Sequence, residues 1–248
     1  MRYFIELSYR GTHYHGWQVQ PNAHSVQGEI ERGLRLILRQ PDLSIMGSGR
    51  TDTGVHAREQ FAHFDVPEAL DTTWLTQRLN AFLPKDIAIH RIFPVSSQMH
   101  ARYSATQRSY EYHLVRKKSP FAIGLAYYYW HPLNIEAMQA AAATLTGYED
   151  FQAFSKVKTQ VKNFRCRIDT AYWETQADRW VFHVSANRFL RGMVRALVGT
   201  LLEVGKGTHD LESWDAIIRS KDRRRAGAAA PPEGLFLNRV RYPEHLFD

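Results

Sequence analysis

Apolar and polar positions alternate along the first half of the chain with two different periods. A period of two predicts a strand, and a period of 3.6 predicts an amphipathic helix. Val26, Ile30 and Leu34 share one face of the expected helix at 25–38, which begins with Ser25 as its N-cap. These periods predict strands at residues 2–9, 60–66 and 87–95, and helices at residues 25–38 and 72–84.

The second half repeats this mixture. Strands are expected at residues 108–115, 170–175, 179–186 and 234–243, and helices at 135–147, 187–207 and 213–220. Such a mixture is typical of an α+β fold. Because the two halves meet near residues 95 to 107, we expect two sub-domains, at 1–100 and 101–248, with a cleft between them. A cleft at such a junction is a common place for a site.

The charge balance favours a polyanionic partner. The formal net charge is +7 and the sequence pI is near 9.5, as in many proteins that bind nucleic acid. Arginine suits phosphate binding and base stacking because its guanidinium is planar. It gathers in three clusters: Arg165 and Arg167; Arg188, Arg191 and Arg195; Arg223, Arg224 and Arg225. A solvated charged face explains any one cluster equally well.

Three features argue against other classes of protein. Cys166 is the only cysteine, so an internal disulfide and a cysteine-based metal cluster are impossible, and we expect a structural thiol. The sequence has no apolar run of about 18 residues, so no membrane span is expected. Charges within the first residues do not fit a signal peptide. We expect a cytoplasmic protein.

Residues 48–57, SGRTDTGVHA, place one carboxylate, Asp52, in a stretch rich in glycine. Because glycine is a poor residue for helix and strand interiors, the stretch is predicted to be a loop that presents an acid. A lone loop aspartate is often structural, since it accepts backbone N–H groups in turns. Arg50 lies beside it, and an arginine from another element can pair with it, which favours a functional carboxylate.

Two other classes of site share pieces of this pattern. The tripeptide DTG at 52–54 matches the D-[ST]-G element of aspartic proteases. Those enzymes need two aspartates, and this chain has one such tripeptide, so it would need a symmetric dimer. His13 with His15, or Asp52 with His56, resemble pairs of metal ligands. The chain has no HEXXH element or carboxylate cluster, so we expect no metal.

The expected long helix carries an arginine face. Arg188, Arg191 and Arg195 gather there, with Gly192 and Gly199 between them. A glycine-lined face of this kind can approach a flat polyanion closely, and a solvated helix face is the equal alternative. A buried arginine on this helix would need a carboxylate partner.

Aromatic side chains in two stretches are candidates for stacking on bases. Tyr110 and Tyr112 share one side of their expected strand, where a ring can pack over a base or in the core. In YRGTHYHGWQVQ, residues 9–20, Tyr14 and Trp17 either stack on RNA bases or pack the loop, and the nearby glutamines Gln18 and Gln20 share this ambiguity. Composition and spacing leave both alternatives open.

Together these stretches resemble the tRNA pseudouridine synthase A family. GRTDTGVHA is similar to the family's catalytic-aspartate loop, and YRGTHYHGWQVQ to its N-terminal motif, with Arg10 and Tyr14 as departures. SATQRSYEY is similar to the strand with the active-site tyrosine. NRFLRGMVRALVGTLLEVGKG is similar to the arginine-bearing helix, and APPEGLFL to the closing strand. The matches run from residue 3 to 242, nearly the whole chain.

The resemblance implies an α+β fold of two ferredoxin-like sub-domains, with mostly antiparallel sheets flanking a basic cleft. It implies isomerisation of uridine to pseudouridine at positions 38 to 40 of the anticodon stem-loop of tRNA, by a homodimer. Carried over by position, Asp52 is the catalytic aspartate and Arg195 pairs with it. Tyr110 is implied to stack on the target base, Arg50 to hold the flipped nucleotide or its gap, and Leu235 to form an apolar wall.

The reaction makes chemical sense of these residues. It breaks the bond from ribose C1′ to base N1, rotates the base and rejoins it through C5, so no cofactor is required. A carboxylate can attack C1′ or C6, or remove a proton from C2′, and these alternatives stay open. Phosphate contacts in a basic cleft offset the cost of unstacking the base. The other hypothesis is a tRNA-binding or chaperone protein on the same scaffold that performs no chemistry.

Overall fold

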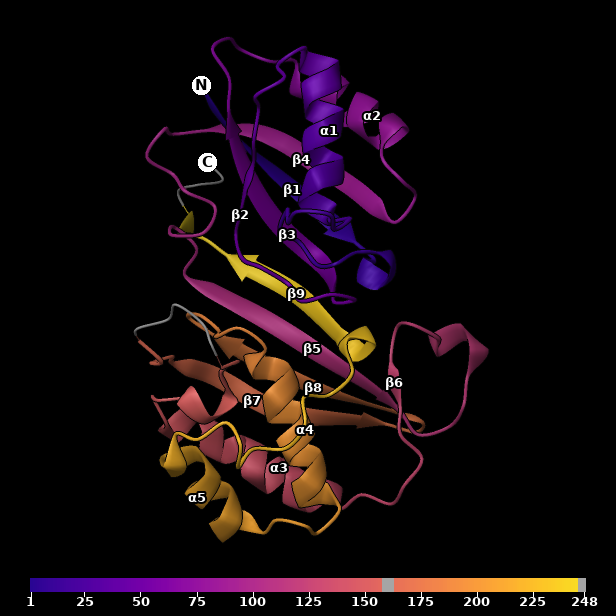
Figure 1. The fold of residues 1–248 in the computed structure, drawn as a ribbon, viewed down its shortest axis with the longest axis vertical. Helices are drawn as coiled ribbons and strands as arrows, with labels where there is room; N and C mark the ends of the chain where they lie inside the picture. The colour runs from indigo at the N-terminus through magenta and orange to yellow at the C-terminus, as the bar shows by residue number, and fades with distance from the viewer. Residues whose placement is uncertain (158–162, 245–248) are drawn as a thin grey trace. The chain divides into compact units, whose positions relative to one another are not determined.

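The computed structural model describes residues 1–157 and 163–244. Its contacts divide the chain into two compact units (Figure 1). Unit 1 comprises Met1–Thr106 and Phe236–Asp248, and unit 2 comprises Gln107–Leu235. The chain therefore returns to unit 1 after unit 2, from Phe236 onwards.

Unit 1 contains a mostly antiparallel sheet. Its strand order is β4-β1-β3, where β1 is Arg2–Tyr9, β3 is His56–Asp65 and β4 is Ile87–Val95. The short strand β2 (Met46–Gly47) pairs with β3 antiparallel, and β9 (Leu235–Arg241) pairs with the start of β3 parallel. The strand expected at 60–66 therefore begins earlier than its alternation indicates, directly after the loop that carries Asp52.

Two helices cover this sheet, α1 (Val26–Leu38) and α2 (Thr72–Phe82). The expected N-cap of α1 is confirmed, because the Ser25 hydroxyl accepts the backbone N–H of Gly28. The two helices pack against each other, and α2 lies along β4 (Figure 1). The predicted apolar positions of α1, Val26, Ile30 and Leu34, are buried, and so are Leu75 and Leu79 of α2. Burial of each such side chain contributes about 1.5–3 kcal/mol.

Unit 2 repeats the combination of antiparallel sheet and helices. Its strand order is β5-β8-β7, where β5 is Gln107–Val115, β8 is Arg179–Ala186 and β7 is Ile168–Gln176. The short strand β6 (Tyr127–Tyr128) pairs with β5 parallel. With both units described, the expected α+β class with mostly antiparallel sheets is confirmed.

The helices of unit 2 are α3 (Ile135–Thr144), α4 (Met193–Gly205) and α5 (Leu211–Ser220). α3 packs against α4, α5 and β7 (Figure 1). Short 3-10 helices occur in both units: η1 (Gly11–His13), η2 (Pro120–Ala122), η3 (Leu145–Gly147), η4 (Gln152–Phe154) and η5 (Pro232–Gly234).

The expected helix at 187–207 is wrong in its first turns, because α4 begins only at Met193. Gly192 lies at φ +71°, in the left-handed region, which interrupts a right-handed helical path. Arg188 and Arg191 precede this residue and are not helical. The predicted arginine face of the helix therefore does not form, and of the three arginines only Arg195 lies on α4.

Candidate active site

The Asp52 loop, residues 48–55, connects β2 to β3 in unit 1. The backbone N–H of Val55 donates to the carbonyl of Asp52 at 3.2 Å, which closes a turn with Gly54 at φ +77°. Asp52 is half-buried and Arg50 is exposed. The predicted loop that presents a carboxylate is confirmed.

A second loop, residues 10–24 between β1 and α1, packs against the Asp52 loop. The N–H of Gly54 donates to the Tyr14 carbonyl at 3.2 Å, and the N–H of Trp17 donates to the Thr51 carbonyl at 3.4 Å. Tyr14 and Trp17 are each only 2% exposed. Their rings are packed inside the protein, Tyr14 beside His24 and Trp17 beside Tyr9, and the alternative that they stack on RNA bases is wrong.

Two glycines let these loops approach each other. A Cβ on Gly16 would lie 2.3 Å from the carbonyl oxygen of Thr51, and Gly16 adopts φ +86°. A Cβ on Gly11 would lie 1.9 Å from the carbonyl oxygen of Val55. Real side-chain carbons do not come this close to backbone oxygen, so any larger residue would displace the Asp52 loop.

His56 secures the end of the Asp52 loop. Its Nδ1 accepts the backbone N–H of Gly11 at 3.0 Å, and its buried ring stacks on Phe236 with ring centroids 4.6 Å apart. The sequence suggested His56 and Asp52 as a possible pair of metal ligands. Because Nδ1 accepts a hydrogen bond and the ring is packed, His56 has a structural role. Within residues 1–157 and 163–244, no group of three or more His, Cys, Asp or Glu side chains could hold a metal ion.

In unit 2, Arg195 is held by the segment 226–231. Its Nε donates to the carbonyl of Ala230 at 2.7 Å, and the N–H of Ala230 donates to the Arg195 carbonyl at 2.9 Å. A Cβ on Gly199 would lie 1.7 Å from the carbonyl oxygen of Ala228. Gly199 therefore packs against the segment 226–231 of the same chain, and the expectation that it lines a surface for a polyanion is wrong.

The two tyrosines of β5 differ in their surroundings. Tyr110 is half-buried, and its ring contacts Phe189 edge-on at 5.0 Å. Tyr112 is fully buried and donates its hydroxyl to the carbonyl of Pro231 at 2.8 Å. Burial raises the pKa of Tyr112 far above its ordinary value, so it is a neutral donor. Leu235, at the start of β9, is buried.

The structure thus places the expected site residues in two groups. Asp52 and Arg50 share one loop of unit 1, whereas Arg195, Tyr110 and Leu235 belong to unit 2. Sequence reasoning missed the residues that support them, of which Gly11 and Gly16 were visible only as loop glycines, and His56 only as a possible metal ligand.

Some arginines of the predicted clusters form ion pairs within unit 2. The pairs are Arg165 with Glu149, Arg167 with Asp169 and Arg224 with Asp222. All are surface pairs, which contribute little to stability and are screened by salt. Cys166 is buried, and burial raises the pKa of its thiol to about 11, which fits the expected structural role.

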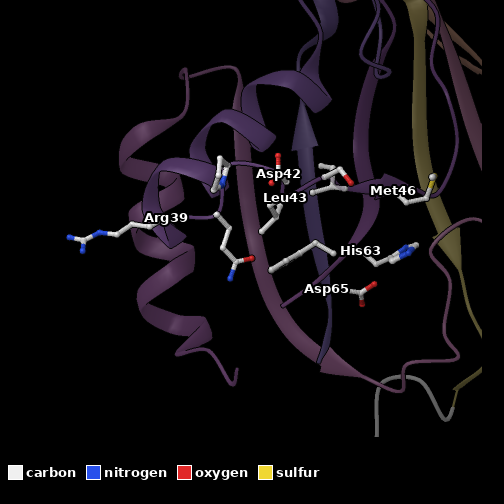
Figure 2. Close-up of a pocket in the computed structure, with 11 residues that line it drawn as sticks. Arg39, Asp42, Leu43, Met46, His63 and Asp65 are labelled. Carbon is white, nitrogen blue, oxygen red and sulfur yellow. The ribbon is translucent and has the colours of Figure 1, made fainter. Parts of the chain in front are cut away.

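A surface pocket of about 620 Å³ lies elsewhere in unit 1. Residues 39–46 line it together with 63–65 of β3, and the guanidinium of Arg39 points away from it (Figure 2). Asp52 and Arg50 are not among its lining residues, so this pocket is separate from the Asp52 loop. In the described part of the chain no helix is long and apolar enough to cross a membrane.

The profile of the family described as tRNA pseudouridine synthase matches residues 7–104 and 141–243. Three proteins named tRNA pseudouridine synthase A are similar over nearly their full lengths. The one from Porphyromonas gingivalis is 49% identical over 250 residues, covering 99% of each chain.

The protein from Parabacteroides distasonis is 48% identical over 247 residues, covering 99% of this chain and 98% of its own. That from a Geobacillus species is 40% identical over 241 residues, covering 95% and 96%. This chain belongs to the tRNA pseudouridine synthase family, and the resemblance seen in its motifs is confirmed.

Proposed function

We propose that this chain isomerises uridine to pseudouridine in tRNA, at positions 38 to 40 of the anticodon stem-loop. Family membership and full-length similarity to proteins named tRNA pseudouridine synthase A support the reaction. The observation that carries the proposal is Asp52 itself, a half-buried carboxylate in a loop clamped by residues 10–24 and by His56. A clamped carboxylate is suited to chemistry because its position is fixed before substrate arrives.

In this proposal Asp52 acts on the flipped nucleotide, by attack at C1′ or C6 or by removal of the C2′ proton. Arg195 pairs with Asp52, and its bond to Ala230 supports this role because it fixes the direction of the guanidinium. Tyr110 stacks on the detached uracil and Leu235 forms an apolar wall beside it. Arg50, exposed next to Asp52, holds the flipped nucleotide or fills its gap.

No cofactor enters the reaction, because the substrate supplies every atom of the product. The bond from C1′ to N1 breaks, the bond from C1′ to C5 forms, and the proton on C5 leaves to solvent while N1 gains one. We place this activity in the cytoplasm, because its substrate is tRNA. The single cysteine of the chain, which cannot form an internal disulfide, fits this compartment.

The test maps pseudouridine in a tRNA transcript with uridine at positions 38, 39 and 40. A carbodiimide adduct that survives alkali marks pseudouridine and stops primer extension. We expect stops at these positions after incubation with the protein, and none when the uridines are replaced by cytidine. Tight tRNA binding without any stop would instead support the non-catalytic binding or chaperone protein.

We further propose a homodimer, which one loop of unit 2 supports. This loop runs from residue 116 through η2 and β6 to residue 131, and it is anchored because Arg116 donates to the carbonyls of Tyr129 and His131. It nevertheless displays apolar side chains, with Phe121 91% exposed and Ile123 70% exposed. Apolar groups on an anchored loop are typical of a protein interface.

The mass in solution tests the dimer. Sedimentation equilibrium of the wild type is expected to give twice the chain mass of 28.7 kDa. The Phe121→Glu variant is expected to shift the equilibrium towards monomer. A wild-type monomer at micromolar concentration would contradict this proposal and leave the assigned reaction untouched.

A further inference from the structure

A buried amide holds the start of the Asp52 loop, opposite the end that His56 secures. Gln60 lies on β3 and is 0% exposed. Its Oε1 accepts the hydroxyl of Ser48, and its Nε2 donates to the carbonyl of Gly49 at 3.0 Å. Ser48 is also buried, and its N–H donates to the carbonyl of Phe61 at 2.7 Å. One side chain thus bridges two consecutive residues of the loop.

This bridge needs a side chain that accepts and donates at once without charge. A neutral amide does both, whereas an ionised carboxylate only accepts. Because the amide of Gln60 is buried, loss of either bond would leave a polar group without its partner, at a cost of about 1–3 kcal/mol. The pair of bonds therefore specifies the path of the backbone at this point.

The path from Gly49 to Asp52 is short. Only Arg50 and Thr51 lie between them, and the next fixed point is Thr51, whose carbonyl accepts the N–H of Trp17 and whose Oγ1 lies 2.9 Å from the hydroxyl of Tyr9. A displacement at Gly49 therefore moves Arg50 directly, and it reaches Asp52 by straining the two bonds that hold Thr51. Displacements of about 1 Å in a site can cost a hundredfold in rate.

We propose that Gln60 is a positioning residue for the isomerisation, which fixes Ser48 and Gly49 so that Arg50 and Asp52 meet the flipped nucleotide in one geometry. The proposal rests on the proposed function through the role of Asp52. Gln60 acts through the loop and does not touch RNA. Its removal should therefore lower kcat and leave the KM for tRNA nearly unchanged.

The deciding variant is Gln60→Glu, followed by kcat as a function of pH. A protonated glutamic acid donates to the Gly49 carbonyl and accepts from Ser48, as the amide does. An ionised one loses the donor and repels that carbonyl. Burial raises the pKa of such a carboxyl above its usual value of about 4.3. We expect kcat to fall about tenfold to a hundredfold as pH rises through this pKa, and to recover on acidification.

The wild type provides the baseline for this profile. It has the same charged residues near position 60 in the sequence as the variant, namely Arg50, Arg58 and Glu59, so any effect of their charge appears in both profiles. Glu59 accepts the N–H of Val240 at 2.7 Å and so has its own partner. The control for a carboxyl introduced elsewhere in unit 1 is Asn80→Asp. Asn80 is exposed, and its side chain donates to the carbonyl of Ile89 and accepts the N–H of Ile89, both at 2.8 Å, between α2 and β4. This control should lose stability and show no such step in kcat.

If Gln60→Glu does not fold, Gln60→Met provides the test, since it keeps the length and removes both bonds. A lower kcat with unchanged KM supports the proposal in either variant. A pH profile like that of the wild type, or a rise in KM at constant kcat, would overturn it. Failure of the proposed function is recognised separately, because the wild type in the same assay would then form no pseudouridine, and the positioning role would fall with it.

Discussion

The two units hold their candidate site residues by different means. In unit 1 the Asp52 loop has little hydrogen bonding of its own, so residues 10–24 and Gln60 supply its partners, and His56, directly after the loop, accepts the N–H of Gly11. In unit 2 Arg195 lies on a helix, which forms its own backbone bonds, and Ala230 adds one bond to the Arg195 carbonyl and one to its side chain. The conformation of the loop depends on hydrogen bonds from neighbouring segments, whereas the conformation of a helix depends mostly on hydrogen bonds within the helix.

This contrast predicts that small changes around the Asp52 loop affect catalysis first, while similar changes on α4 affect stability first. The predictions that follow compare the two regions in order of expected size.

Gly16→Ala should have the largest effect. Its Cβ would clash with the Thr51 carbonyl and its φ is positive, so strain and overpacking together cost about 3–4 kcal/mol. Relief by movement of the Asp52 loop should lower kcat about a hundredfold. Steady-state kinetics and urea unfolding measure the two effects. A variant with normal kcat would break the comparison, because the loop would then tolerate displacement.

Acid should destabilise unit 1 through His63 on β3. Burial, followed by the positive charges of Arg2 and His100, lowers the pKa of His63 from 6.5 to about 4, and its Nδ1 accepts the N–H of Ala101. The unfolded state therefore binds a proton that the folded state rejects. This contribution to stability is complete above pH 6.5 and declines as pH falls towards 4, by up to about 3 kcal/mol.

Urea unfolding at several pH values measures this decline. The His63→Asn variant keeps an acceptor for Ala101 and does not titrate, so its stability should depend less on pH in this window. Equal slopes for the wild type and the variant would show that another group is responsible.

Gly199→Ala should have the smallest effect, about 2 kcal/mol of stability. The added Cβ would displace the Ala228 carbonyl, and a better helix propensity offsets about 1 kcal/mol of the overpacking. α4 keeps the backbone of Arg195 in place while the segment 226–231 that binds its guanidinium shifts, so kcat should fall, but less than in Gly16→Ala. A larger loss of kcat than in Gly16→Ala would reverse the comparison.

Features that depend on nearby residues could be predicted from the sequence, whereas features that depend on tertiary contacts could not. Periodicity located α1 and its Ser25 cap, and glycine density located the Asp52 loop, because both are local properties of the chain. The start of α4 was wrong because a single left-handed residue, Gly192, outweighs an apolar pattern that continues through it. The roles proposed for Asp52 and Arg195 come from the family resemblance, because no periodicity in the sequence indicates them.

The supporting contacts had no local signal at all. Gly16 is required by a carbonyl 35 residues away in the sequence, that of Thr51, and Gln60 by a loop that begins 12 residues before it. Such requirements arise from tertiary packing and become visible only when the loops are placed together. Sequence reasoning also left Trp17 between packing and base stacking, and its burial decided in favour of packing.

The central claim is that Asp52 performs the chemistry. Its most direct test is the release of tritium from tRNA labelled at uracil C5, with wild type and Asp52→Asn side by side and tRNA binding measured for both. The hydrogen on C5 is lost only when the ring is rejoined through C5. We predict release by the wild type and none by the variant, with tRNA still bound. Release by Asp52→Asn at the wild-type rate would contradict the claim.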